Sequence, residues 1–98
     1  MTEKESVEKP SQLDLTALEI EQIIGLFMGI LTAKAWQYMG LQLTPGKSET
    51  VKDMAKASTT IDCISYLADK IVPLMPESEA SSLRVMITDL KINYARNA

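Results

Sequence analysis

The chain of 98 residues is long enough for one domain with a modest core, and it leaves little material for an enclosed active site. Hydrophobic residues make up 46% of the sequence and charged residues 23%, a balance that excludes global disorder. The net charge is -3 and the Lys and Arg residues are scattered singly, so the chain lacks the basic surface that binds nucleic acid.

Residues 1–13 are mostly polar and charged, and we expect a disordered tail there, followed by a single helical domain over residues 14–98. The start of the chain has no basic-then-apolar signal segment, and a lone cysteine, Cys63, cannot form an internal disulfide. The longest apolar stretch, residues 23–33, is shorter than the ~20 apolar residues that span a bilayer. These features predict a cytoplasmic protein.

The first helix is predicted to begin near Asp14 or Thr16 and to run to about Met39. Thr16 and Glu19 have the spacing of a capping box, in which each residue bonds the backbone N–H of the other. Gly40 follows the last apolar position and is typical of a helix stop.

Apolar side chains cover well over half of the circumference of this first helix. One stripe repeats at three- and four-residue spacing and contains Ile20, Ile23, Ile24, Phe27, Ile30, Leu31 and Tyr38. A second set widens the stripe and contains Leu18, Leu26, Ala33, Trp36 and Met39. A helix on the surface of a globular protein needs only one apolar face. We therefore expect this helix to be covered on two sides.

A loop is predicted over residues 41–47, followed by an amphipathic helix that begins near Ser48 or Glu49 and ends or kinks at Pro73. A third helix is predicted from Glu77 to Tyr94, with acidic residues in its first turn. No alternating stretch favours a strand, and short connections favour antiparallel neighbours. The predicted fold is all-α: a small antiparallel three-helix bundle.

Three segments carry a family resemblance. They are LFMGILTAKA at residues 26–35, followed by Gly40-Leu41 and a loop with Pro and Gly; IDCISYLADK at residues 61–70; and ITDLKINY at residues 87–94. From Leu26 to Tyr94 the chain resembles the bacterial family called domain of unknown function 1844, which implies a small helical fold and supplies no activity. Two arginines of that family stand here as Lys91 and Asn93, which offer no guanidinium fork for a bidentate anion contact.

The sequence predicts no catalytic, cofactor or metal site, and we expect no enzyme activity. The segment Gly46-Lys47-Ser48 lacks the earlier glycine and the preceding strand of a phosphate-binding loop. Cys63 has no histidine to activate it, and we expect it to pack as a small hydrophobic residue. The acids near apolar runs have no third ligand and are interpreted as solvated charges, or as an ion pair of Asp62 with Lys70 or Lys91: Asp62, Asp69 and Asp89.

The second apolar side of the first helix predicts contact with another protein. Two glycines, Gly25 and Gly29, have two interpretations. They permit the close approach of a second helix, or they are simply tolerated in a helix that other packing stabilises. The function predicted is a protein–protein interaction module, either a homo-oligomer (most simply a dimer) or an accessory subunit of a larger complex. The alternative is a peripheral membrane helix or a protein that binds an apolar ligand. The expected contact residues are Ile23, Leu26, Phe27, Gly29, Ile30, Ala33 and Trp36.

Overall fold

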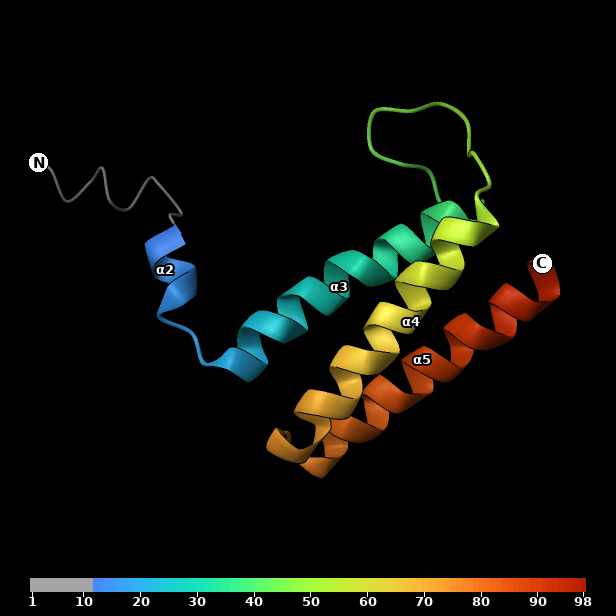
Figure 1. The fold of residues 1–98 in the computed structure, drawn as a ribbon. Helices are drawn as coiled ribbons and strands as arrows, with labels where there is room; N and C mark the ends of the chain where they lie inside the picture. Colours follow the sequence, from blue (N-terminus) through green and yellow to red (C-terminus); the bar gives the residue numbers. More distant parts are fainter. Residues whose placement is uncertain (1–11) are drawn as a thin grey trace, which may run out of the picture.

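A computed structural model describes residues 12–98, and residues 1–11 of the expected tail lie outside the described part. Within residues 12–98, four α-helices and one 3-10 turn follow one another (Figure 1): α2 (Gln12–Thr16), α3 (Ile20–Tyr38), α4 (Met54–Ile71), η1 (Val72–Leu74) and α5 (Glu77–Asn97). The described residues form no strand, which confirms the all-α prediction.

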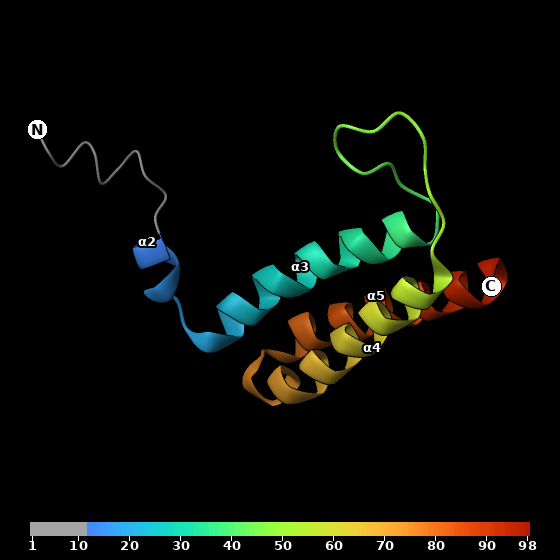
Figure 2. The same cartoon turned by 45° about the horizontal axis from the view of Figure 1, so that its top comes forward.

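Helix α4 lies between α3 and α5 in Figure 1 and runs antiparallel to both. Figure 2 shows α3 lying along one side of the pair that α4 and α5 form. The largest fully buried side chains come from all three helices: Met39 on the end of α3, Ile64 on α4 and Leu90 on α5. The shortest dimension of the molecule is 19 Å, close to two helix diameters. Each of these helices also has an exposed side that carries a large hydrophobic residue: Ile30 on α3, Tyr66 on α4 and Val85 on α5.

The closest helix packing joins α3 to α4. Ala35 on α3 and Ala57 on α4 are each 0% exposed, so small side chains occupy the contact near the connected ends of these helices. Contact between α3 and α5 includes the Thr32 hydroxyl, which lies 3.5 Å from the sulfur of Met86. The core is therefore shared by three helices, with α4 at its centre.

The predicted first helix is wrong at its amino end, because α2 stops at Thr16 and α3 starts only at Ile20. The cap lies three residues later than predicted. Glu19 adopts an extended backbone (φ -72°, ψ 159°), and its N–H donates to the side-chain oxygen of Gln22 at 2.9 Å. Glu19 and Gln22 therefore form a capping box, which satisfies backbone N–H groups at the start of α3.

The carboxyl end of α3 confirms the predicted stop at Gly40. This glycine has a φ of +80°, a conformation in which a Cβ is strained. The N–H of Leu41 donates to the carbonyl of Trp36 and that of Gly40 to the carbonyl of Gln37, each at 3.0 Å. These two bonds close a Schellman motif and satisfy the last carbonyls of the helix.

Helix α4 begins at Met54 rather than near Ser48, because Asp53 supplies the cap. The Asp53 carboxylate accepts a hydrogen bond from the Lys56 N–H at 3.1 Å. The Asp53 N–H donates to the Tyr38 carbonyl at 2.7 Å, which joins the two ends of the connecting loop. At the other end α4 stops at Ile71, before Pro73, as predicted.

Candidate interaction surface

An apolar strip runs along the face of α3 that points away from the core. Ile30 is 61% exposed because helical geometry sets it about 200° around the axis from buried Met28, on nearly the opposite side of the helix. The neighbouring side chains follow at three- and four-residue spacing and lie on the same face. We call this set the outer strip: Ile20, Ile23, Leu26, Phe27 and Ile30. Ile23 is half-buried and the other four are exposed.

The carboxyl end of the outer strip is covered by polar groups. Gln37, on the same face of α3, is buried, and its side-chain oxygen accepts hydrogen bonds from Lys34 Nζ at 2.9 Å and the Thr44 hydroxyl at 3.2 Å. Thr44 belongs to the loop after α3, so that loop folds over the end of the helix. The Lys34 ammonium also lies 4.9 Å from the centre of the Tyr38 ring. The uncovered apolar surface therefore ends near Lys34.

A groove between α3 and α4 adjoins the outer strip. Its volume is about 420 Å³, and its walls are almost entirely apolar. We call it the α3–α4 groove, and its lining residues are Leu31, Asp62, Cys63, Tyr66 and Leu67. Leu31 lies one helical turn after Phe27, which connects the groove to the outer strip. Tyr66, at 62% exposed, extends the apolar surface from α3 onto α4.

The structure brings together four of the predicted contact residues and sets the rest apart. Ile23, Leu26, Phe27 and Ile30 all belong to the outer strip. Ala33 is half-buried and Gly29 is exposed. Trp36 packs against the buried core and points to the other side of α3. Assignment of these residues to a contact stays a prediction. The sequence pattern does not predict Tyr66 as part of this surface, because Tyr66 lies outside the apolar period of α4.

Gly25 and Gly29 face open space. A Cβ added at either position would meet no other atom within 4 Å. In the described part of the chain, therefore, no second helix uses the close approach that these glycines allow. Both interpretations of the pair stay open, because a partner chain can occupy the same space.

Replacing Gly25 by Ala is expected to raise the free energy of unfolding by about 1 kcal/mol, because Ala has the higher helix propensity and its Cβ meets no neighbour. Chemical denaturation followed by circular dichroism measures the change. Gly46→Ala is the matched control: its Cβ also meets open space, but its φ is +87°. That substitution is expected to lower stability by about 1 kcal/mol. A loss of stability at Gly25 would contradict the open environment.

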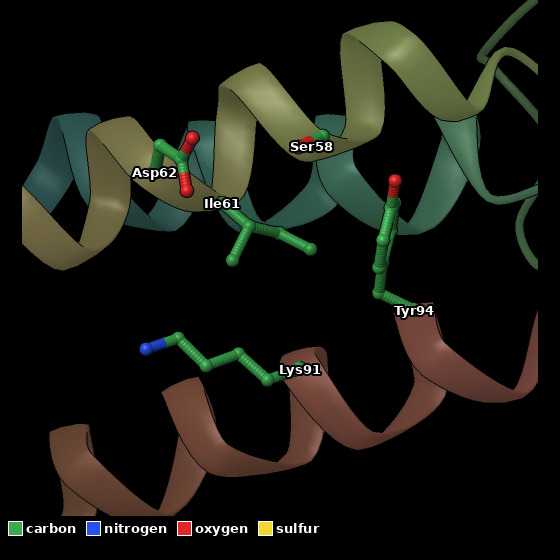
Figure 3. Close-up of a pocket in the computed structure, with 5 residues that line it drawn as sticks. All are labelled: Ser58, Ile61, Asp62, Lys91 and Tyr94. Atoms are coloured by element: carbon green, nitrogen blue, oxygen red, sulfur yellow. The ribbon is translucent and has the colours of Figure 1, made fainter. Parts of the chain in front are cut away.

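A second, more polar pocket of about 240 Å³ lies between α4 and α5 (Figure 3). Figure 3 shows Asp62 and Lys91 on opposite sides of the pocket, with Ile61 on the same helix as Asp62. Both charged side chains are exposed, and the structure records no ion pair between these two described residues. Lys70 instead lies 5.2 Å from the centre of the Tyr66 ring. The hydroxyl-bearing residues Ser58 and Tyr94 complete the lining of the pocket.

Cys63 is exposed, which corrects the prediction that it packs as a small hydrophobic residue. The core side of α4 is formed by Ile61, Ile64 and Ala68, and position 63 falls outside that face. Across residues 12–98, no three His, Cys, Asp or Glu side chains are grouped closely enough to hold a metal ion. The same residues include no helix that is both long and apolar enough to cross a membrane.

Comparison with known proteins shows the family to which the chain belongs. No curated protein and no solved structure matches the chain. The family model described as Domain of unknown function (DUF1844) matches residues 22–96, which include α4 and nearly all of α3 and α5. The match confirms the resemblance seen over Leu26 to Tyr94. It covers most of the sequence, and the chain therefore belongs to the DUF1844 family.

Proposed function

We propose that this protein is a helical interaction module that associates with a second copy of itself through the outer strip. The observation that carries the proposal is the contiguous apolar surface on α3. The outer strip and Tyr66 expose on the order of 500 Å², a large part of the ~800 Å² that each partner contributes to a stable interface. The largest apolar patch on a soluble protein is often functional, and a second copy would remove this one from water.

Charge supports a second copy in the antiparallel direction. The outer strip has Glu19 at its amino end and Lys34 at its carboxyl end. A two-fold axis across the middle of the strip would bring Glu19 of each copy towards Lys34 of the other. It would also oppose the dipoles of the two α3 helices, which is the favourable arrangement. A parallel arrangement would place like charges together.

The same charges favour a protein partner over a lipid surface. Helices that lie in a membrane interface usually flank their apolar face with Lys and Arg. The amino half of α3 carries Glu19, Glu21 and Gln22 instead. Anionic headgroups would repel these carboxylates, whereas a second protein chain can pair with them.

Ile30→Glu is expected to convert a dimer into a monomer while the helix content is unchanged. Ile30 is 61% exposed within one chain, so a carboxylate there stays solvated in the monomer. In a symmetric dimer it would be buried twice, at a combined cost of about 4 kcal/mol, which raises the dissociation constant about a thousandfold. Light scattering measures the mass and circular dichroism the helicity.

Val51→Glu is the control for this experiment. Val51 is 75% exposed but lies in the loop before α4, away from the outer strip. It is expected to keep the dimer mass. The proposal fails if the unsubstituted protein has the mass of a single chain at micromolar concentration, or if Ile30→Glu leaves the dimer unchanged.

A further inference from the structure

We propose that the α3–α4 groove is the receptor for the Phe27 side chain of the second copy, an inference that rests on the proposed self-association. Each copy would insert its own Phe27 and receive the partner's at the same time. The two contacts are identical by symmetry, as a two-fold interface requires. The groove and Phe27 then form the centre of the interface, with the rest of the outer strip around them.

Phe27 is the side chain best suited to fill an apolar recess. It is the one phenylalanine in the sequence, and it is 52% exposed within a single chain. Aromatic rings dominate the energetics of interfaces because they bury a large area in a fixed shape. The helix that carries Phe27 is packed on α4 through small residues, so the ring is held on a rigid element.

The α3–α4 groove has the chemistry to receive such a ring. Leu31 and Leu67 are half-buried in its walls, and the exposed Tyr66 ring offers an aromatic edge or face. Its volume of about 420 Å³ is ample for a benzyl side chain. Asp62 is the charged member of the lining, and it is exposed, where it can stay hydrated.

The position of the groove next to Phe27 identifies the occupant as a second copy. Within one chain the Phe27 ring stays half exposed and the groove stays open, so the ring does not fill the groove of its own chain. An unrelated partner could bind either the projecting Phe27 ring or the α3–α4 groove and would not require both. A surface that carries both, one helical turn apart on α3, is complementary to itself. The two-fold axis that pairs Glu19 with Lys34 runs through this same region.

A mixed cross-linking experiment tests the contact. One chain carries Phe27→Cys together with Cys63→Ser, and the other chain is unsubstituted. In a mixed dimer the thiol introduced at position 27 faces Cys63 of the other chain, while the remaining Phe27 keeps one native contact. Oxidised glutathione takes up the two electrons and two protons as the disulfide forms. The expected product is a covalent dimer whose joined peptides contain position 27 and Cys63.

The control chain carries Val51→Cys with Cys63→Ser and is expected to give no such product. A second readout uses native Cys63, which is exposed in one chain and would be shielded in the dimer. Its labelling by a thiol reagent is expected to be lost as the protein concentration rises, and to return with Phe27→Ala. A dimer with freely labelled Cys63 and no cross-link would overturn the groove contact alone. A monomer at every concentration would overturn the self-association as well.

Discussion

Replacing Ile64 by Ala is expected to lower the free energy of unfolding by about 3 kcal/mol. Ile64 is 0% exposed near the middle of α4, the helix that contacts both α3 and α5. The loss combines the transfer free energy of the missing carbons with the cavity that they leave. For a domain this small it is a large share of the ~5–15 kcal/mol that separates folded from unfolded protein. Urea denaturation followed by circular dichroism measures it.

Ile92→Ala is the matched control, since it is the same substitution on a helix but at a side chain 45% exposed. It is expected to change the stability by less than about 1 kcal/mol, because little apolar area leaves the core. Equal losses at Ile64 and Ile92 would contradict the placement of the core on α4. Both measurements are made in the Ile30→Glu background, so that association does not contribute to the stability.

Replacing Ala57 by Leu is expected to lower the free energy of unfolding by about 2 kcal/mol or more. Ala57 is 0% exposed, as is Ala35 on the opposing helix, so the site has no room for a longer side chain. The extra carbons would push α3 away from α4 or force strained rotamers. Thermal unfolding of the variant measures the loss. Because α3 would shift on α4, the α3–α4 groove would change shape together with the core.

Ala55→Leu is the control for this substitution. Ala55 lies two residues earlier in α4 and is exposed, so a longer side chain there points into solvent. Its expected effect on stability is within about 0.5 kcal/mol. A similar loss for both variants would mean that Leu disturbs α4 itself rather than its packing on α3.

The helices and several of their ends could be predicted because the determinants are local. A period of three and four residues specifies the apolar faces, and Gly40 and Pro73 stop their helices through their own backbone chemistry. The start of α4 differs from the prediction because Asp53 caps the helix in place of Ser48, and the bond from the Asp53 N–H to the Tyr38 carbonyl holds Asp53 in position across the loop. No pattern within residues 48–53 reveals that contact.

The second apolar side of α3 could be predicted, but its neighbours could not. Periodicity shows that α3 is too apolar for one core face, and the exposed Phe27 and Ile30 agree with that. Which residues face inwards depends on the crossing of α3 over α4, and this placed Trp36 against the core. Tyr66 reaches the same surface from α4, a juxtaposition that exists only in three dimensions.

The closed base of the loop between α3 and α4 has a consequence for variation in the family. The hydrogen bond from Asp53 to Tyr38 fixes both ends of the loop, whatever the path of residues 41–52 between them. Doubling such a loop adds only about 0.6 kcal/mol of closure entropy. Insertions here would therefore leave the helix crossing intact, and we expect relatives that differ in length at this point to keep the same bundle.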